Sequence, residues 1–213
     1  MSSEKQNEAQ ETLPATPAAP APTAPSAPSA PSHAAPSASR PGSPSVLIDS
    51  ATLERRIAEL AEQIDRDYAS SEKLVCVGVL KGSVFFLVDL VKRLQVPVAI
   101  DFFQTASYGG GTSPGEVRIR KDLDMPVRGA DVLLVEDIVD TGYTLRTILD
   151  LLRWRGAKSV RLCALLDKAA ARQVDVPIDY CGFTIANLFV VGYGLDYAER
   201  YRNLPYIGVM EST

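Results

Sequence analysis

The sequence has one histidine, His33, among its 213 residues. It lies in a segment rich in alanine, proline and serine, so the rest of the chain contains no histidine. Serine–histidine and cysteine–histidine nucleophilic sites are therefore excluded from that remainder, as are histidine-rich zinc sites. Any catalysis there must depend on carboxylates, lysine, tyrosine, backbone dipoles or a bound metal ion.

Cysteine is also scarce. Cys76, Cys163 and Cys181 lie singly within apolar, strand-like runs, and no CxxC pair occurs. Isolated cysteines in such runs are typical of small buried hydrophobic residues in a reducing compartment. This pattern weighs against metal or redox chemistry at the thiols and favours a cytoplasmic location.

An excess of positive charge and a long apolar run are both missing. The chain has 22 lysines and arginines against 26 acids, a net charge of -4. This balance weighs against a general binder of nucleic acids or membrane surfaces. No apolar run reaches the roughly 20 residues that a membrane-spanning helix needs. We therefore expect neither nucleic acid nor a membrane as a partner.

Proline is plentiful in only one part of the chain. Residues 1–45 hold 10 of the 15 prolines, interspersed with alanine and serine. Such a composition cannot bury a core, so it predicts a disordered extension. It has neither the basic start nor the apolar segment of a signal peptide. The predicted folded domain therefore comprises residues 46–213.

Helix and strand patterns alternate through this domain. Apolar residues spaced by three and four predict a helix over residues 50–68, with Ser50 as its cap. Apolar runs predict strands at residues 73–80, 98–107, 131–135 and 159–166, with shorter ones near 117–123, 180–184 and 189–192. Helices are predicted over residues 81–94 and 143–155. This rhythm predicts an α/β fold whose parallel sheet has helices on both sides.

One stretch, VLLVEDIVDTGYTL at residues 132–145, carries an unusual concentration of acids. Its apolar strand delivers Glu136 and Asp137 to the sheet edge where open parallel sheets bind ligands. Because consecutive strand residues point to opposite sides, each carboxylate can accept a hydrogen bond from one of two neighbouring sugar hydroxyls. Taken alone, however, the pair would be interpreted as two solvated loop acids.

The residues that follow change this interpretation. Asp140, Thr141, Gly142, Tyr143 and Thr144 lie between the strand and the next helix, whose first N–H groups are unpaired. Glycine allows close approach of the backbone, and the threonines offer hydroxyls, so the segment suits a phosphate monoester. Neither a Walker A sequence nor a Rossmann fingerprint occurs. A phosphate cradle beside two hydroxyl acceptors predicts a ribose 5-phosphate site.

The same stretch resembles the phosphoribosyl-diphosphate-binding motif of type I phosphoribosyltransferases. Further segments resemble the bacterial hypoxanthine (guanine) branch: residues 80–83 its pyrophosphate loop with a cis peptide before the lysine, 107–109 the start of its lid, and 189–197 its purine-binding segment. The resemblance covers the chain from Val46 to its end. It implies a central, mostly parallel sheet flanked by helices, with a small hood and a mobile lid loop.

The resemblance implies a purine salvage enzyme. It would transfer the 5-phosphoribosyl group from phosphoribosyl diphosphate to hypoxanthine, and also guanine, giving IMP or GMP and pyrophosphate. Mg²⁺ is implied as the cofactor, and a homodimer or homotetramer as the assembly. Asp140 would take the proton from the attacking purine nitrogen, a role that the lack of histidine leaves to a carboxylate. Capping the following helix is a second reading of Asp140, compatible with the first.

The resemblance also assigns the other site residues. The ribose and its 5-phosphate would be bound by Glu136, Asp137, Ile138, Asp140, Thr141, Gly142, Tyr143 and Thr144. Pyrophosphate would be bound by Leu80, Lys81, Gly82 and Arg202, with Ser107 and Tyr108 in the lid. The purine would be bound by Lys168, Phe189, Val190 and Asp196, and Mg²⁺ by Glu136, Asp137 and Asp196. Lys168 can only donate hydrogen bonds, so it would select a 6-oxopurine over adenine.

One lid residue departs from the family pattern. Pro114 fixes its own φ and restricts Ser113, which would alter the kinetics of lid closure.

Two alternative functions remain open. The first is a phosphoribosyltransferase-like protein that regulates transcription by binding RNA. It would need a basic face, which the net charge does not favour. An enzyme for adenine, xanthine or orotate would be distinguished by a panel of bases.

Overall fold

The structure is a computed structural model that describes residues 44–107 and 117–210. Of the predicted extension at residues 1–45, residues 1–43 lie outside the described part, and Ser45 is the first residue of a strand. The lid residues Tyr108 and Pro114 also lie outside the described part, while Ser107 is the last residue of a strand. In the part of the chain that is described, no helix is both long enough and apolar enough to cross a membrane.

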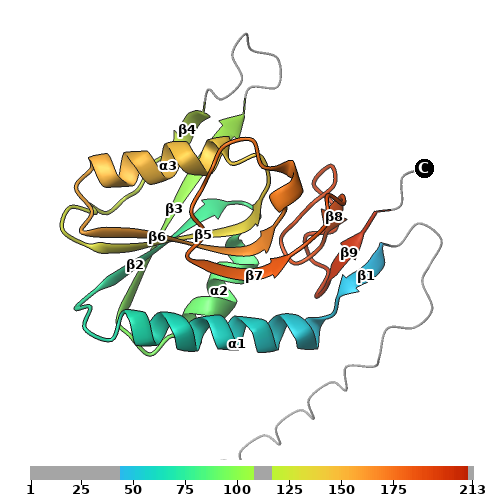
Figure 1. Cartoon of the computed structure of the whole chain (residues 1–213), viewed down its shortest axis with the longest axis horizontal. Coiled ribbons are helices and arrows are strands. Elements are labelled where there is room, and N and C mark those ends of the chain that lie inside the picture. The colour runs from blue at the N-terminus through green and yellow to red at the C-terminus, as the bar shows by residue number, and fades with distance from the viewer. Residues whose placement is uncertain (1–43, 108–116, 211–213) are drawn as a thin grey trace, which may run out of the picture. The chain divides into compact units, whose positions relative to one another are not determined.

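A six-stranded sheet forms the centre of the fold, with the strand order β4-β3-β2-β5-β6-β7 (Figure 1). Its strands are β2 (Leu74–Leu80), β3 (Val98–Ser107), β4 (Val117–Lys121), β5 (Asp131–Val139), β6 (Ser159–Asp167) and β7 (Tyr180–Thr184). All neighbouring strands pair in parallel except β3 and β4, which are antiparallel. The predicted mostly parallel sheet is thus confirmed, and its parallel strands end at one edge.

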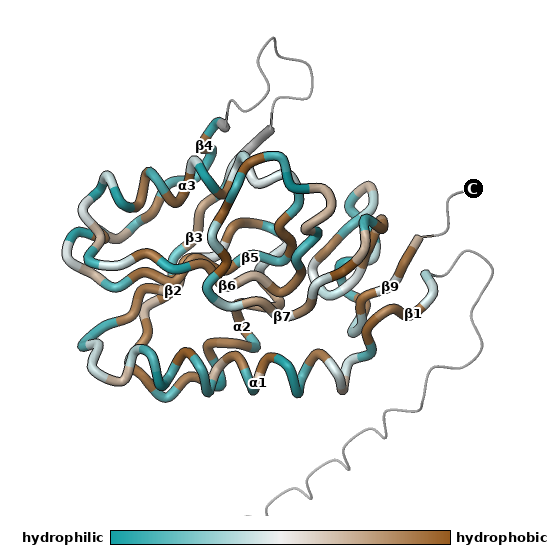
Figure 2. The backbone as a smooth tube through the Cα atoms, in the orientation of Figure 1, coloured by the Kyte–Doolittle hydropathy of each residue, from teal (hydrophilic) through white to brown (hydrophobic). Residues whose placement is uncertain are grey.

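Helices cover both faces of this sheet. They are α1 (Ser50–Asp67), α2 (Val84–Val91) and α3 (Tyr143–Trp154), with a short 3-10 turn, η1 (Ala169–Ala171), after β6. Figure 1 shows α1 and α2 on one face and α3 on the other. Each face has its own buried cluster of apolar side chains. Figure 2 shows the hydrophobic residues concentrated in the central strands, while apolar and polar residues alternate along α1. This is the pattern of a buried sheet covered by amphipathic helices.

Helix α1 begins at Ser50, one residue earlier than a cap at Ser50 would require. Asp49 is the N-cap, and its Oδ1 accepts a hydrogen bond from the backbone N–H of Thr52 at 2.8 Å. Ser50 is already helical, so the prediction of Ser50 as the cap is wrong. The predicted apolar face is confirmed, and its members are buried: Leu53, Ile57, Leu60 and Ile64. Helix α2 is shorter than predicted because Lys81–Ser83 form a turn after β2.

A second, small antiparallel sheet has the order β1-β9-β8 and forms the hood. It consists of β1 (Ser45–Ile48), β8 (Val190–Val191) and β9 (Ile207–Val209). Strand β1 pairs with β9, which joins the two ends of the described chain, and β8 pairs with β9. The hood holds residues 189–202 beside the edge at which the parallel strands end (Figure 1).

Candidate active site

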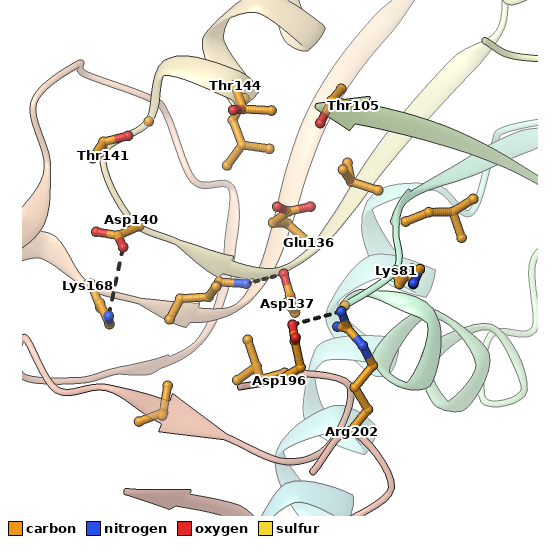
Figure 3. A pocket seen from close by; sticks show the side chains of 18 of the residues that line it. Lys81, Thr105, Glu136, Asp137, Asp140, Thr141, Thr144, Lys168, Asp196 and Arg202 are labelled. Carbon is orange, nitrogen blue, oxygen red and sulfur yellow. Dashed lines mark hydrogen bonds and ion pairs between the residues drawn. The ribbon is translucent and has the colours of Figure 1, made fainter. Parts of the chain in front are cut away.

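A cavity of about 460 Å³ lies where the strands of the large sheet end (Figure 3). Fifteen of its lining residues belong to the predicted site: Leu80, Lys81, Gly82, Glu136, Asp137, Ile138, Asp140, Thr141, Gly142, Thr144, Lys168, Phe189, Val190, Asp196 and Arg202. Four lining residues were not predicted: Val79, Thr105, Leu145 and Leu195. Of these, only Thr105 is polar. It lies near the carboxyl end of β3, so the general rule that ligands bind at the carboxyl ends of parallel strands could have predicted it. Tyr143 is the first residue of α3 and does not line the cavity.

Two neighbouring acids from β5 line the cavity from opposite sides of their strand (Figure 3). Asp137 is 9% exposed, and burial raises its pKa to about 6, although its Oδ1 accepts a hydrogen bond from the N–H of Ile138. Burial also raises the pKa of Glu136 well above its ordinary value, and the charge of Asp137 adds to this effect. Oε2 of Glu136 is buried and has no hydrogen-bond partner among the described residues. The pair therefore favours a ligand that brings a cation or hydroxyl donors.

The turn after β2 packs tightly against β5 and the hood. The Leu80–Lys81 peptide bond is cis, as the family resemblance implied. A Cβ atom built on Gly82 would lie 1.6 Å from Oδ2 of Asp137. Gly194 has a φ of +103°, and a Cβ atom there would lie 2.0 Å from the carbonyl oxygen of Gly82. Glycine is thus required at both positions for the three segments to meet.

The loop after β5 leads into the amino end of α3. Gly142 is the N-cap residue, with a φ of +94°, and no side chain among residues 44–107 and 117–210 caps the helix. The alternative role of Asp140 as a cap is therefore not found. Asp140 is followed by Thr141, whose carbonyl oxygen accepts hydrogen bonds at 3.0 Å from the N–H groups of Gln173 and Val174. These hydrogen bonds hold the loop in place. The N–H groups at the start of α3, to which no described side chain bonds, can bind an anion.

Asp140 and Lys168 face each other across the ends of β5 and β6. Nζ of Lys168 lies 3.8 Å from Oδ2 of Asp140, and the lysine is 8% exposed. Arg172 supports this region, although it was not predicted from the sequence. Its Nε donates to the carbonyl oxygen of Asp140 at 3.0 Å, and its guanidinium forms an ion pair with Asp167. The arrangement places a proton acceptor beside a fixed donor.

The hood contributes an aromatic ring and a second charged pair. Phe189 is 52% exposed, and its ring packs edge-on against Tyr197 with the centroids 5.6 Å apart. Nη2 of Arg202 lies 2.7 Å from Oδ1 of Asp196, and its Nη1 donates to the carbonyl oxygen of Gly194. The buried Nε of Arg202 lacks a partner among the described residues. The exposed ring can stack on a planar ligand, and the arginine can donate to an anion.

The predicted magnesium ligands fit a cation that is bound together with its substrate. Within residues 44–107 and 117–210, no group of three His, Cys, Asp or Glu side chains is arranged to hold a metal ion by itself. Glu136, Asp137 and Asp196 nevertheless line one cavity, and Oε2 of Glu136, which is buried there, has no hydrogen-bond partner in the part of the chain that the structure describes. Mg²⁺ prefers oxygen ligands and is commonly held by one or two carboxylates, substrate phosphates and water. The carboxylate oxygens of this cavity therefore fit a Mg²⁺ ion that is held jointly by the protein, substrate phosphates and water.

Known proteins resemble the chain over most of its described part. It is 50% identical over 165 residues to the hypoxanthine phosphoribosyltransferase of Salmonella typhimurium, covering 76% of this chain and 93% of that protein. It is 53% identical over 167 residues to the bifunctional protein TilS/HprT of Listeria monocytogenes. That match covers 78% of this chain but only 26% of the Listeria protein. The similarity to the longer protein is thus confined to one part of it.

The fold and the cavity define a type I phosphoribosyltransferase, and residues 47–198 match the family model described as "Phosphoribosyl transferase domain". A crystal structure of the hypoxanthine phosphoribosyltransferase of Staphylococcus aureus matches with a TM-score of 0.75 and 47% identity, covering 78% of this chain and 90% of that one. The chain therefore belongs to the hypoxanthine phosphoribosyltransferases within the phosphoribosyltransferase family.

Proposed function

We propose that this protein transfers the 5-phosphoribosyl group from phosphoribosyl diphosphate to hypoxanthine, and also to guanine, in purine salvage. The products are IMP or GMP and pyrophosphate. The observation that carries this proposal is the content of one cavity of about 460 Å³. It brings together the loop before α3, two neighbouring acids of which Asp137 is buried, a lysine beside an aspartate, and an exposed aromatic ring.

The donor is held by its sugar and both of its phosphate ends. The N–H groups and hydroxyls of residues 140–144 bind the 5-phosphate at the start of α3. Glu136 and Asp137 accept hydrogen bonds from the ribose hydroxyls, or bind them through a metal shell. Lys81, Gly82 and Arg202 receive the pyrophosphate. Binding at three places fixes the anomeric carbon for attack, which lowers the entropic part of the barrier.

The purine lies between Phe189 and the Asp140–Lys168 pair. Phe189 stacks on the base, and the backbone of Val190 contacts the edge of the base. The ammonium group of Lys168 donates to the 6-oxo group and so disfavours adenine. As the bond from the sugar to the ring nitrogen forms and the bond to pyrophosphate breaks, Asp140 accepts the proton of that nitrogen. No histidine in the domain competes for this role.

Charge develops on the departing pyrophosphate, and the site has groups that stabilise it. The backbone N–H groups of the Lys81–Gly82 turn and the guanidinium of Arg202 face this charge. Glu136, Asp137 and Asp196 would hold Mg²⁺ together with oxygens of the donor. When bound, the ion would neutralise charge on the leaving group.

Location and assembly complete the proposal. The three cysteines are free thiols, which is typical of a reducing compartment such as the cytoplasm. A homodimer or homotetramer remains our prediction. Apolar side chains that lie exposed on β1 and α2 would suit such an interface: Val46, Leu47, Phe85 and Val88.

The test is a spectrophotometric assay with Mg²⁺, phosphoribosyl diphosphate and one base at a time. Hypoxanthine, guanine, xanthine and adenine form the panel, and Asp140→Asn is the matched variant because it keeps the shape and removes the proton acceptor. We expect IMP from hypoxanthine and a roughly 10²- to 10⁴-fold lower rate in the variant. No turnover of any base by a protein that binds the donor would overturn the proposal.

A further inference from the structure

We propose that Glu199 is a positioning residue that stands in for pyrophosphate when the site is free of ligand. Its carboxylate holds Lys81 and Arg202, the two cations assigned to pyrophosphate, and gives up Lys81 when pyrophosphate binds. The inference rests on the proposed function, because that function assigns pyrophosphate to Lys81 and Arg202, and it adds the ammonium group of Lys81 to the groups that bind the anion.

One oxygen of Glu199 lies between the two cations. Oε2 is 3.0 Å from Nζ of Lys81 and 3.5 Å from Nη2 of Arg202. Lys81 belongs to the turn after β2, whereas Arg202 belongs to the hood, so the carboxylate joins two separate parts of the fold. Both cations line the active-site cavity, and Glu199 is not one of its lining residues. The acid therefore reaches the cations from outside the space that the substrate would fill.

The segment that carries Glu199 has an unusual backbone. Ala198, Glu199 and Tyr201 have φ values of 50°, 62° and 75°, a left-handed conformation that is unfavourable for residues other than glycine. The N–H of Glu199 donates to Oδ2 of Asp196 at 2.8 Å, which fixes the turn from inside. Backbone strain of this kind is found where a ligand clamp requires it. Here the turn directs an acid at the pyrophosphate cations.

The two contacts of Glu199 differ in how easily they are exchanged. The side chains of Lys81 and Glu199 are 55% and 66% exposed, so their ion pair is weak and screened by salt. Arg202 is fixed independently, by Asp196 at 2.7 Å and by the carbonyl oxygen of Gly194. Arg202 thus keeps its place if Glu199 is lost, whereas Lys81 is released. Pyrophosphate has more charge and more acceptor oxygens than one carboxylate, and it therefore replaces Glu199 as the partner of Lys81.

A stand-in anion weakens pyrophosphate binding, because part of the new interaction replaces an existing one. Glu199→Gln removes the competing charge and should strengthen binding of pyrophosphate about three- to fivefold, the range expected for one exposed ion pair. The gain should shrink at high salt. In steady-state kinetics, the inhibition constant of pyrophosphate and the KM of phosphoribosyl diphosphate should fall by a similar factor. The KM of hypoxanthine should not change.

The experiment is calorimetric titration of the full-length protein with inorganic pyrophosphate and Mg²⁺ at low and high salt. Glu199→Gln is compared with Glu199→Asp, which keeps the charge on a shorter side chain and should give an intermediate affinity. Glu62→Gln is the control for net charge, because Glu62 is exposed on α1 and should leave the affinity unchanged. Thermal unfolding confirms that each variant is folded.

The outcomes separate this inference from the proposed function. Tighter pyrophosphate binding by Glu199→Gln, but not by Glu62→Gln, would support the stand-in role. Unchanged or weaker binding by Glu199→Gln, in a protein that forms IMP, would overturn this inference alone. A wild-type protein that neither forms a nucleotide nor binds pyrophosphate would overturn the proposed function, and the inference with it.

Discussion

Gly82 lies directly against the carboxylate of Asp137. A Cβ atom on the glycine would be 1.6 Å from Oδ2 and 2.6 Å from Cγ of the acid. The other side of the turn is equally closed, because Gly194 of the hood packs against the carbonyl oxygen of Gly82. The turn after β2, the acidic end of β5 and the hood therefore meet without space for one methyl group, and a shift in any of them moves the others.

We accordingly expect Gly82→Ala to lower kcat/KM by about 100-fold, since a misplacement of about 1 Å at a reacting site has an effect of this size. The protein should still fold, as shown by circular dichroism and thermal unfolding. Gly129→Ala is the control: Gly129 has a φ of +73° but no atom within 4 Å of the added Cβ. That change should lower stability by about 1 kcal/mol and leave activity unchanged. Full activity of Gly82→Ala would show that the contact is not needed.

The raised pKa of Asp137 predicts how stability depends on pH. Its carboxyl binds a proton more tightly in the folded protein, with a pKa of about 6 against 3.8 ordinarily. The stability that it contributes is therefore complete below pH 3.8 and is lost as the pH rises through about 6, a change of up to about 3 kcal/mol. Urea unfolding of the ligand-free protein between about pH 4 and pH 7 measures this loss. Asp137→Asn should lose less stability between about pH 4 and pH 7. If the free energy of unfolding fell equally with pH in both proteins, the raised pKa of Asp137 would be contradicted.

The motif at residues 132–145 could be interpreted from the sequence because all of its parts lie in one continuous segment. A buried strand, two acids and a glycine before a helix predict phosphate and sugar sites without any distant residue. The parallel sheet was also predictable, since each buried strand has its own apolar run. The roles predicted for Lys168 and Phe189 depended on the family resemblance, because a single lysine or phenylalanine has no local pattern that indicates a function.

Other features depend on contacts between distant parts of the chain. Arg172 lies 32 residues beyond Asp140, whose carbonyl oxygen it binds, and no spacing rule connects them. Strands β1 and β9 have four and three residues, too few to show a period, and exist because they pair with each other. The capping error at α1 has a different origin: Asp49 and Ser50 are both good N-cap residues, and only backbone geometry distinguishes them.

Lys168 should control which base is accepted. It is 8% exposed, lies beside Asp140 and can only donate hydrogen bonds. Lys168→Gln retains a donor and adds an acceptor, which can receive a hydrogen bond from the amino group of adenine. We expect kcat/KM for hypoxanthine to fall by about 10- to 100-fold and the preference for hypoxanthine over adenine to narrow.

The control for this prediction is Lys158→Gln. Lys158 pairs with Asp131 at 3.0 Å and lies at the opposite end of the sheet, where β5 and β6 begin. Its replacement should leave the relative rates with hypoxanthine, guanine and adenine as they are. An unaltered base preference in Lys168→Gln would show that another group selects the 6-oxopurine.

Arg172 should set the affinity for the phosphoribosyl donor without touching it. Its Nε donates to the carbonyl oxygen of Asp140, and its ion pair with Asp167 holds the guanidinium against the loop after β5, to which we assign the 5-phosphate. Arg172→Gln removes both contacts, so the loop relaxes and the KM for phosphoribosyl diphosphate should rise roughly tenfold, as expected for a loss of about 1.4 kcal/mol in binding. Stability should fall by about 2 kcal/mol, because hydrogen bonds to a charged group are lost.

The matched control for this prediction is Arg153→Gln. Arg153 pairs with Asp150 on the exposed side of α3, so its replacement should change neither the KM for phosphoribosyl diphosphate nor the stability. A lower kcat with an unchanged donor KM in Arg172→Gln would instead mean that Arg172 acts on the orientation of Asp140 towards the purine, because Asp140 is the carboxylate that we propose as the proton acceptor.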